Sequence, residues 1–366
     1  MASINFKHTP FGDLALISMR GCEDIASQVD YYLKQWRSIP DDESFVVPAN
    51  CPRFGTGEAK AVLKHTARGL DAYIICDCFN YSVTYKMYGQ TVPMSPDDHY
   101  QDLKRIIAAL GGKARRITVI MPMLYEGRQH RRTTRESMDC AMALQELVAM
   151  GVKNIVTFDA HDPRVNNAIP LDGFDNVQAA YQMIKALLKT VPDIKLNRDH
   201  TMIVSPDEGG MGRCIYYSSV LGLDLGMFYK RRNYSVVVNG RNPIEAHEFL
   251  GNDITGKDLI LVDDMISSGE SMLDIAAKLK EKGAGRIFIF STFGLFVEGF
   301  EKFDQYYADG KIDKIFTTNL IYQPQELLDR EWYCSVNMSK YIALLVETLN
   351  ELRDTPKTGD DSKPWL

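Results

Sequence analysis

The sequence of 366 residues has no hydrophobic run long enough to span a membrane and no excess of positive charge. A spanning helix needs about 18 consecutive apolar residues, and the N-terminal segment lacks the basic start, apolar core and cleavage site of a secretory signal. Lysine and arginine number 42 against 48 acidic residues, a formal net charge of −6, so the cationic field that non-specific nucleic-acid binding requires is missing. These absences predict a cytoplasmic protein that binds neither membranes nor nucleic acids.

Cysteine is scarce and irregularly spaced. The chain has seven cysteines, an odd number, and Cys76 and Cys78 are separated by one residue inside an apolar stretch. Zinc ribbons and thioredoxin-like sites need two intervening residues, and no His-Glu-x-x-His sequence is present. The pattern favours reduced, buried thiols over a disulfide framework and argues against a tightly chelated structural metal.

The rest of the sequence alternates short β-rich runs with amphipathic helical stretches. Each apolar run is long enough for a buried strand and too short for a buried helix. The runs cover residues 73–76, 117–121, 154–158, 201–204, 225–229, 258–262, 286–290 and 314–318. Between them, 271–282 and about 137–150 have the apolar spacing of helices, and a glycine follows each. This alternation predicts an α/β fold with mostly parallel sheets flanked by helices.

The length of the chain predicts two such α/β domains. Proline, asparagine, aspartate and glycine interrupt the apolar periodicity at 162–176, which places the boundary there. We expect an N-terminal domain of residues 1–166 and a C-terminal domain of residues 167–334. A helix within 335–352 is expected to pack back on the first domain, and the polar tail 353–366 is expected to fray.

The strongest local signal is the segment 259–271, in which an apolar strand runs into two carboxylates, a turn and a helix. Such a turn aims backbone N–H groups and the positive end of the helix dipole at one point, where a phosphate monoester fits. The turn residues that would surround the phosphate are Ser268, Gly269 and Ser271. Asp263 and Asp264 would accept hydrogen bonds from sugar hydroxyls or hold a divalent cation. The segment therefore predicts a phosphosugar site; the alternative is a strand end with a simple helix cap.

Residues 262–271, Val-Asp-Asp-Met-Ile-Ser-Ser-Gly-Glu-Ser, resemble the phosphoribosyl pyrophosphate motif of type I phosphoribosyltransferase folds. Further segments narrow the resemblance to the ribose-phosphate pyrophosphokinase family. They are Arg-Phe-Gly-Thr-Gly-Glu at 53–58, Arg-Gln-His-Arg at 128–131, a strand ending in Asp-Ala-His at 159–161, and Ser-Pro-Asp-Glu-Gly-Gly at 205–210. Lys230, Arg231 and Arg232 precede a polar stretch, as the catalytic loop does in that family. The resemblance implies two tandem phosphoribosyltransferase-like domains.

The resemblance also implies an enzyme that transfers pyrophosphate from MgATP to the C1 hydroxyl of ribose 5-phosphate, giving phosphoribosyl pyrophosphate and AMP. Lys230 and Arg232 would be the catalytic residues, and His161 and Asp207 would hold Mg²⁺. The ATP-binding residues would be Phe54, Glu58, Arg128, Gln129 and Arg131. The residues for ribose 5-phosphate would be Asp263, Asp264, Ser267, Ser268, Gly269 and Ser271. Because the family's nucleotide loop comes from a neighbouring subunit, a homo-oligomer built from dimers, up to a hexamer, is implied.

Taken without the resemblance, these residues have ordinary structural interpretations. The arginines of 128–135 could form a solvated or interface surface, a single histidine such as His161 is commonly structural, and Phe54 could simply pack in its loop. Pyrophosphoryl transfer asks a protein mainly to position a hydroxyl in line with the β-phosphorus and to neutralise charge on phosphate oxygens. The cationic and metal-binding residue types in these segments suit that task, so their combination favours the functional interpretation.

The sequence also departs from the family pattern. Thr56 and His130 each stand where the family has an aspartate, Ser267 where an acid contacts the ribose, and Glu270 where a glycine is expected. Loss of an acceptor for a sugar hydroxyl at 267 is expected to cost about 1–3 kcal/mol of binding. The N-terminal extension and the segment 80–100 are also unexplained by the pattern. Two alternatives therefore stay open: a catalytically weak regulatory member of the family, and a phosphoribosyltransferase.

Overall fold

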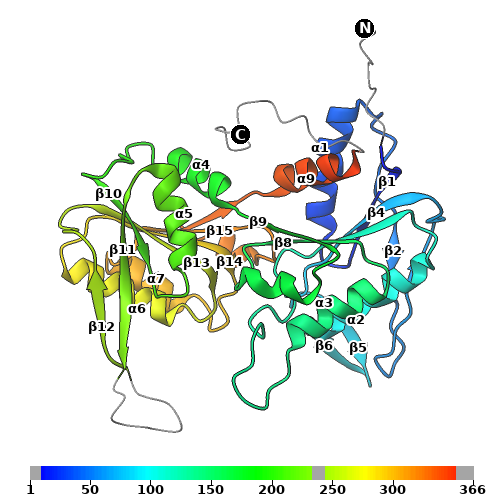
Figure 1. Cartoon of the computed structure of the whole chain (residues 1–366), viewed down its shortest axis with the longest axis horizontal. Coiled ribbons are helices and arrows are strands. Elements are labelled where there is room, and N and C mark those ends of the chain that lie inside the picture. The colour runs from blue at the N-terminus through cyan, green and yellow to red at the C-terminus, as the bar shows by residue number, and fades with distance from the viewer. Residues whose placement is uncertain (1–9, 233–243, 352–366) are drawn as a thin grey trace. The chain divides into compact units, whose positions relative to one another are not determined.

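The computed structural model describes residues 10–232 and 244–351, with the backbone alone described at 230–232 and 244–247. The chain divides into two compact units. Within the described residues, unit 1 consists of 10–157, 162–176 and 339–351, and unit 2 consists of 158–161 and 177–338. Each unit is an α/β structure with its own sheet (Figure 1).

The sheet of unit 1 has five strands in the order β1-β4-β7-β8-β9. The strands are β1 (Asp13–Ser18), β4 (Leu70–Ile75), β7 (Arg116–Ile120), β8 (Asn154–Phe158) and β9 (Gly173–Val177). From β1 to β8, all neighbours pair in parallel. The runs expected at 73–76, 117–121 and 154–158 lie in β4, β7 and β8, whereas β1 and β9 were not expected from the pattern.

Helices and two small hairpins complete unit 1. The helices are α1 (Glu23–Arg37), α2 (Pro96–Leu110), α3 (Asp139–Ala149), the 3-10 helix Pro163–Ala168 and α9 (Ser339–Asn350). The hairpins pair β2 (Ala49–Asn50) with β3 (Val62–Leu63) and β5 (Thr84–Met87) with β6 (Gln90–Pro93). Helix α2 begins where it does because Ser95 and Asp98 cap each other reciprocally and Pro96 fits the first turn. Segment 80–100 is thus mostly a hairpin and the start of a helix.

Helix α9 is joined to unit 1 through a buried carboxylate. Asp71 on β4 is fully buried, and Arg116 on β7 donates to both of its oxygens at 2.8 and 2.6 Å. Asn350, the last residue of α9, donates to the same carboxylate at 2.8 Å, and Arg116 also donates to the carbonyl of Leu349 at 2.6 Å. One guanidinium therefore ties the C-terminal helix to two sheet strands.

The sheet of unit 2 has seven strands in the order β12-β11-β10-β13-β14-β15-β16. These are β10 (Thr201–Ser205), β11 (Asp224–Arg232), β12 (Ile244–Leu250), β13 (Asp258–Ile266), β14 (Ile287–Gly294), β15 (Lys314–Thr318) and β16 (Tyr333–Val336). Only β12 runs antiparallel to its neighbour. The helices are α4 (Ala180–Thr190), α5 (Met211–Leu221), α6 (Glu270–Glu281), α7 (Glu301–Ala308) and α8 (Gln325–Leu328). The strands expected between 201 and 318 are all present.

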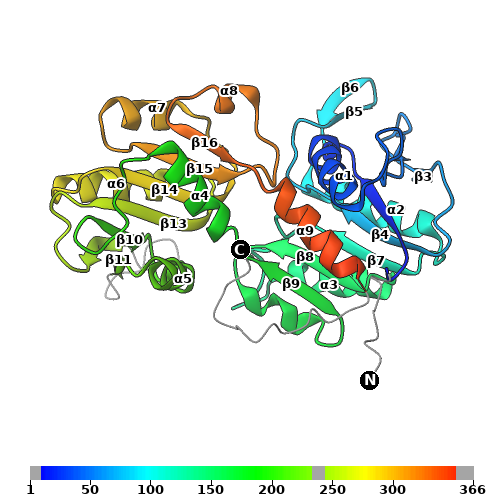
Figure 2. The same cartoon turned by 90° about the horizontal axis from the view of Figure 1, so that it is seen from above.

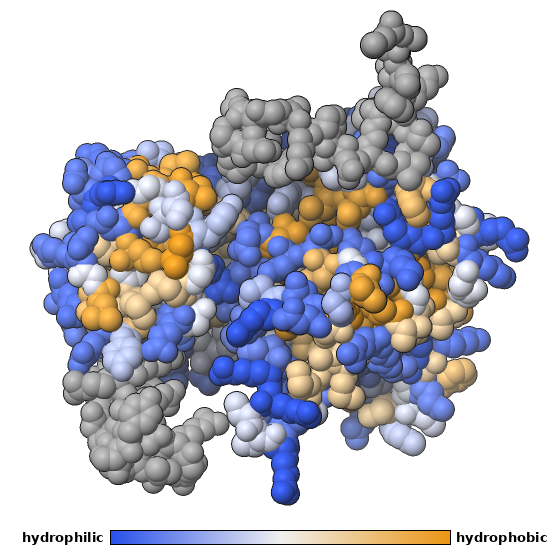
Figure 3. Space-filling view, in the orientation of Figure 1, coloured by the Kyte–Doolittle hydropathy of each residue, from blue (hydrophilic) through white to orange (hydrophobic). Residues whose placement is uncertain are grey.

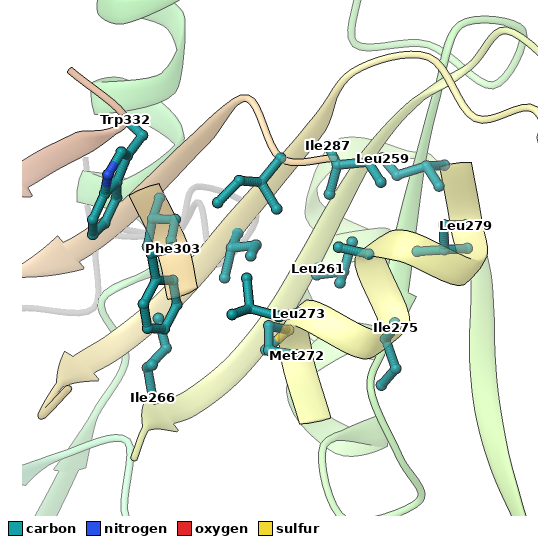
Figure 4. Packing of buried hydrophobic residues seen from close by; sticks show 14 of the residues in the cluster. Leu259, Leu261, Ile266, Met272, Leu273, Ile275, Leu279, Ile287, Phe303 and Trp332 are labelled. Atoms are coloured by element: carbon teal, nitrogen blue, oxygen red, sulfur yellow. The ribbon is translucent and has the colours of Figure 1, made fainter. Parts of the chain in front are cut away.

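The helices of unit 2 cover both faces of its sheet (Figure 2). On one face, Leu259 and Leu261 of β13 pack with Met272, Leu273 and Leu279 of α6, in a cluster that also contains Phe303 and Trp332 (Figure 4). Alternate strand residues face the opposite side, where Tyr217 of α5 packs edge-on against Phe290, with 5.8 Å between the ring centroids. Burial on both faces explains why these strands read as continuous apolar runs.

The strand order of unit 2 reverses between β10 and β13. From β10 the chain passes through α5 to β11 on one side, and from β13 it passes through α6 to β14 on the other. In open α/β sheets, ligands bind outside the carboxyl ends of the strands at such a switch point. The loops after β10 and β13 are therefore where the topology favours a binding site.

The units do not divide where the sequence pattern placed the boundary. The expected break between 166 and 167 falls inside unit 1, because β9 extends the first sheet and brings residues up to 176 with it. Residues 158–161 belong instead to unit 2. The segment 335–352 holds both the end of β16, in unit 2, and α9, in unit 1. The tail 353–366 lies outside the described residues.

No helix in the described part of the chain is both long and apolar enough to cross a membrane.

Replacing Arg116 by methionine is expected to lower the free energy of unfolding by about 3–5 kcal/mol, because the buried carboxylate of Asp71 loses its charged partner. Urea denaturation of the full chain measures the loss. Arg115→Met is the matched control: Arg115 and Arg116 both lie over the ring of Phe11, at 4.8 and 4.3 Å, but Arg115 is exposed and should cost less than about 1 kcal/mol. Equal losses in the two variants would contradict this role of Arg116.

Candidate functional site

The carboxyl ends of β10 and β13 lie side by side in unit 2. The two strands pair in parallel with Val204 opposite Leu261, so the loop 206–210 and the turn 267–269 leave the same edge of the sheet. Strand β11 also pairs in parallel with β10, and its last residues, 230–232, extend at that edge. Lys230 and Arg232 are thus placed by their backbone, while their side chains lie outside the described part of the structure.

The turn after β13 depends on a glycine. Gly269 has φ of +80° and directly precedes α6, and a Cβ added to it would overlap the ring of Phe303 on α7. No side chain caps α6 by a hydrogen bond at this residue, and Ser268 lies next to the helix start, with its Oγ 3.4 Å from the amide of Glu270. Ser268 and Gly269 thus precede α6, and Ser271 lies in its first turn. The N-terminal end of such a helix suits an anion.

Glu270 is directed toward a cation outside the turn. Its side chain is 69% exposed and lies 3.9 Å from the Nζ of Lys302, which also pairs with Glu298 at 3.3 Å. The negative charge of Glu270 at the start of the helix is therefore opposed by Lys302. The neighbouring Ser267 accepts a hydrogen bond from the amide of Val297 at its carbonyl, at 3.0 Å.

Asp263 and Asp264 end the buried part of β13 in different environments. Asp264 is buried and its carboxylate lies 2.8 Å from Nδ1 of His161. Burial alone would raise the pKa of Asp264, but the His161 hydrogen bond and the charge of Arg213 outweigh it and lower the pKa. Burial, followed by the charge of Asp264, raises the pKa of Asp263 to about 8. The pair therefore shares its negative charge unequally.

His161 contacts this carboxylate pair. Its hydrogen bond to Asp264 raises its pKa, against the opposing effect of burial. His161 follows Asp159 at the end of β8, and this short segment, 158–161, is part of unit 2. The predicted metal-binding histidine and the predicted sugar-binding carboxylate are thus in direct contact.

Asp207 lies in the loop after β10. Its carbonyl accepts a hydrogen bond from the Ser205 hydroxyl at 2.7 Å, and its Oδ1 accepts one from the amide of Gly210 at 3.2 Å. These bonds hold the loop in a tight conformation at the switch point. Asp207, like the turn 267–269, therefore occupies the sheet edge where a ligand of unit 2 would bind.

The described residues contain no group of three or more histidine, cysteine, aspartate or glutamate side chains arranged to hold a metal ion. Mg²⁺ in nucleotide sites is commonly bound through one or two carboxylates together with substrate phosphates and water, without a cage made only of protein. Asp263 and Asp264 offer carboxylate oxygens at the sheet edge, and His161 offers a ring nitrogen beside them. The residues fit a cation held partly by substrate.

Arg213 and Asp159 belong to the same cluster, and sequence reasoning missed both as functional residues. Arg213, on α5, donates from Nε to both carboxylate oxygens of Asp159 at 2.8 Å. It also lies 3.8 Å from Asp263 and 4.0 Å from Asp264. The hydroxyl of Thr292 on β14 donates to Asp159 at 2.7 Å. Two local signals were present: Asp159 begins the Asp-Ala-His segment at 159–161, and Arg213 comes shortly after the glycine pair of the 205–210 segment.

The predicted nucleotide loop, residues 53–58, lies in unit 1. The amide of Phe54 donates to the carbonyl of Glu58 at 2.7 Å, which closes the loop, and the side chain of Phe54 is 54% exposed. Arg53 anchors the loop by an ion pair with Asp102 at 2.9 Å. Thr56, one of the departures from the family pattern, donates to the carboxylate of Glu58 at 2.8 Å. The loop therefore presents an exposed aromatic ring and an exposed carboxylate that accepts one hydrogen bond.

The segment 128–131 is also in unit 1. Arg128, Gln129 and Arg131 are exposed, and a hydrogen bond of 2.8 Å from the amide of Gln129 to the carbonyl of Glu126 turns the chain there. His130 lies 3.5 Å from Asp162, which Arg164 also contacts. Unit 2 therefore brings together the predicted sugar and metal residues, and unit 1 carries the predicted nucleotide residues.

The chain is similar in sequence to proteins of one known family. The family profile described as the N-terminal domain of ribose phosphate pyrophosphokinase matches residues 14–151, and that described as the phosphoribosyl synthetase-associated domain matches residues 237–353. A curated ribose-phosphate pyrophosphokinase from Ralstonia nicotianae is 27% identical over 272 residues, 74% of this chain and 76% of the relative. Another, from Ureaplasma parvum, is 27% identical over 312 residues, 84% of each chain.

A solved structure resembles the whole fold. The crystal structure of phosphoribosylpyrophosphate synthetase from Mycobacterium smegmatis superposes with a TM-score of 0.73 and 20% sequence identity, covering 92% of this chain and 98% of that one. The likeness establishes the fold. The predicted fold class, α/β with two phosphoribosyltransferase-like domains built on mostly parallel sheets, is confirmed.

Gly269→Ala is expected to lower the free energy of unfolding by about 2–4 kcal/mol, because the new methyl group meets Phe303 at a residue with positive φ. Gly256→Ala is the matched control: its φ is +71° and no atom lies within 4 Å of the added Cβ, so the cost should be about 1 kcal/mol. Denaturation of both variants measures the difference. If Gly269→Ala were no worse than Gly256→Ala, Phe303 would not constrain the turn.

Asp263→Asn is expected to stabilise the protein increasingly as the pH rises from about 5 to about 8. Between its ordinary pKa of 3.8 and its folded value of about 8, Asp263 holds a proton that the unfolded chain releases. The wild type therefore loses stability over this range, and the asparagine variant avoids that loss, gaining about 1–2 kcal/mol near pH 8.

Urea denaturation at the two pH values measures the effect, with Asp274→Asn on the exposed side of α6 as the control. A stability difference between wild type and Asp263→Asn that is constant with pH, like that of the control, would show that Asp263 has an ordinary pKa.

Proposed function

Because the chain belongs to the ribose-phosphate pyrophosphokinase family, we propose that it transfers the β,γ-pyrophosphoryl group of MgATP to the C1 hydroxyl of ribose 5-phosphate, giving phosphoribosyl pyrophosphate and AMP. One observation carries the proposal. The paired carboxylates Asp263 and Asp264 and the glycine turn at 267–269 lie at the carboxyl end of β13, beside the topological switch point of unit 2.

In this proposal the turn binds the 5-phosphate. The amides at the start of α6 point toward the anion, and the hydroxyls of Ser268 and Ser271 add donors. Gly269 lets the turn adopt its positive φ and pack against Phe303, since a Cβ there would overlap the ring. Asp263 and Asp264 then accept hydrogen bonds from the ribose hydroxyls, which orients the C1 hydroxyl for attack.

The proposed nucleotide-binding residues lie in unit 1, and the proposed catalytic residues lie in unit 2. Phe54 offers its exposed ring for stacking on adenine, and Glu58 offers an acceptor. Arg128, Gln129 and Arg131 are exposed donors suited to phosphate oxygens. Lys230 and Arg232, at the end of β11, would neutralise the charge that develops on the phosphates in the transition state. No covalent intermediate with the protein is needed.

Mg²⁺ would be held by His161 and Asp207 together with the phosphates of ATP. When bound, the ion neutralises phosphate charge and helps to align the transferring group. The contact between His161 and Asp264 at 2.8 Å links this metal site to the sugar site, so the position of one affects the other. Asp207 adds a carboxylate from the loop on the opposite side of the switch point.

We also propose that the protein is a cytoplasmic homo-oligomer. Apolar side chains are exposed on the outer side of α4 and α5, where Figure 3 shows a hydrophobic area. The large ones are Tyr181, Leu188, Ile215, Tyr216 and Val220. Exposed apolar patches of this kind are typical of contact surfaces between proteins. They support association, and they leave the number of subunits open to measurement.

Ser267 favours a second candidate, a catalytically weak member of the family that binds nucleotides and regulates a partner. The hydroxyl at 267 replaces a carboxylate that contacts the ribose in the family pattern, which weakens the grip on the sugar by about 1–3 kcal/mol. The other departures, at Thr56, His130 and Glu270, each have a polar partner in the structure. Ser267 is therefore the departure that most affects the activity.

Incubation of the full chain with ATP, Mg²⁺ and ribose 5-phosphate should release AMP, and Lys230→Ala should reduce the rate at least a hundredfold because a transition-state cation is lost. Coupled AMP detection measures both. Ser267→Asp should lower the KM for ribose 5-phosphate severalfold.

Turnover no greater than that of Lys230→Ala would overturn the proposed reaction, and retained ATP binding in that case would support the regulatory candidate. Consumption of phosphoribosyl pyrophosphate with a nucleobase would identify a phosphoribosyltransferase instead.

A further inference from the structure

Arg213 is a buried cation that faces acidic side chains from two other segments of unit 2. It is the third residue of α5, and its side chain is 10% exposed. Asp159 comes from the end of β8, and Asp263 and Asp264 come from the end of β13. Helix α5 follows the loop that carries Asp207. One guanidinium therefore faces the ends of both β8 and β13, on a helix that follows the Asp207 loop.

Asp159 fixes the direction of the guanidinium. The Nε of Arg213 donates to both of its carboxylate oxygens at 2.8 Å, and Thr292 donates to the same carboxylate at 2.7 Å. Asp159 itself has φ of +43°, a strained conformation for a residue other than glycine. Strain of this kind persists only where the surroundings hold the residue, and it concentrates at functional sites.

The rest of the guanidinium reaches the carboxylate pair of β13 without bonding to it. Nη1 of Arg213 is 3.8 Å from Asp263 and 4.0 Å from Asp264, beyond hydrogen-bond distance. At this separation the positive charge attracts both carboxylates without occupying their oxygens. One oxygen of Asp264 contacts His161 at 2.8 Å, and one oxygen of Asp263 accepts a hydrogen bond from the amide of Asp264 at 2.9 Å. A guanidinium that bonded directly would use those oxygens, and a neutral side chain would remove the positive charge that faces both carboxyl groups.

We infer that Arg213 is a positioning residue that holds Asp263 and Asp264 in the orientation in which they receive the ribose hydroxyls. The inference rests on the proposed function, because it assigns a role in binding ribose 5-phosphate. It makes α5 part of the sugar site, although no residue of α5 belongs to the predicted phosphosugar segment. The simpler role of Arg213, neutralising the buried Asp159, predicts a different response to mutation.

The experiment compares Arg213→Lys with the double variant Asp159→Asn/Arg213→Met. Lysine keeps the charge but cannot bridge Asp159 and the carboxylate pair, so the KM for ribose 5-phosphate should rise at least tenfold while the KM for ATP stays within twofold. The double variant removes the buried charges of Asp159 and Arg213 together, so no buried charge is left unpaired between them. Its thermal unfolding temperature should therefore be close to that of Arg213→Lys or higher. Its KM for ribose 5-phosphate should still be raised at least tenfold.

Arg286→Lys is the matched control. Arg286 pairs with Asp258 and Asp193, at 2.7 and 2.9 Å, near the amino ends of β13 and β14, away from the predicted site residues. This variant should leave both KM values within twofold of wild type. A structural role alone would make Arg213→Lys and Arg286→Lys alike in kinetics.

The outcomes separate the two claims. If the wild type releases no AMP from ATP and ribose 5-phosphate, the proposed function fails and this inference fails with it. If the wild type is active and the double variant has a KM for ribose 5-phosphate within twofold of wild type, the inference alone is overturned, because neutralising Asp159 would then be the whole role of Arg213. A raised KM for the sugar with an unchanged KM for ATP in both variants supports it.

Discussion

Two adjacent carboxylates, Asp263 and Asp264, lie near the carboxyl end of β13, a strand that is buried on both faces, and the rest of the site is arranged around their charge. Taking a carboxylate out of water is costly unless it is paired and hydrogen-bonded. His161 pairs with Asp264 at 2.8 Å, and Arg213 lies about equally far from both carboxylates, at 3.8 and 4.0 Å. Burial, followed by the charge of Asp264, still raises the pKa of Asp263, so the compensation from His161 and Arg213 offsets the cost of burial only in part. Sugar hydroxyls and a divalent cation are the groups that would complete it.

The topology of unit 2 brings these residues together from distant parts of the sequence. The strand order reverses between β10 and β13, so the loops carrying Asp207 and Gly269 open toward opposite sides of one edge. The end of β8 adds Asp159 and His161, and β14 adds Thr292. Packing fixes the turn itself, since Phe303 lies where any side chain at position 269 would have to go. Arg213, the two carboxylates and the turn 267–269 therefore lie on helices and strands or directly next to them, and not in long loops.

Much of the fold could be predicted from the sequence, because strands buried on both faces read as uninterrupted apolar runs and helices keep their apolar spacing. The run 258–262 lies in β13 and 271–282 almost coincides with α6. Strand β9 could not be predicted, since Gly-Phe-Asp-Asn-Val has neither continuous nor alternating apolar character. That strand is also why the expected boundary at 166 was misplaced. The local structure of the candidate site could be predicted because each motif spans only a few consecutive residues.

The contacts of Arg213 could not be predicted from local sequence patterns. Its partners Asp159 and Asp263 lie 54 and 50 residues away in the chain, and only the packing of α5 against the sheet brings them within reach. A local pattern shows which residue types stand near a strand end, but it does not show which way a helix turns its third residue. The same limit applied to Thr56 and His130, which looked like losses of an acid and are instead hydrogen-bonded to Glu58 and placed beside Asp162.

The most direct test of this account is a crystal structure of the full chain grown with ribose 5-phosphate and Mg²⁺. The account predicts the phosphate on the backbone amides that begin α6, between Ser268 and Ser271, and the ribose hydroxyls on Asp263 and Asp264. Ribose 5-phosphate bound elsewhere, with the turn at Gly269 empty while the sugar is at saturating concentration, would contradict it.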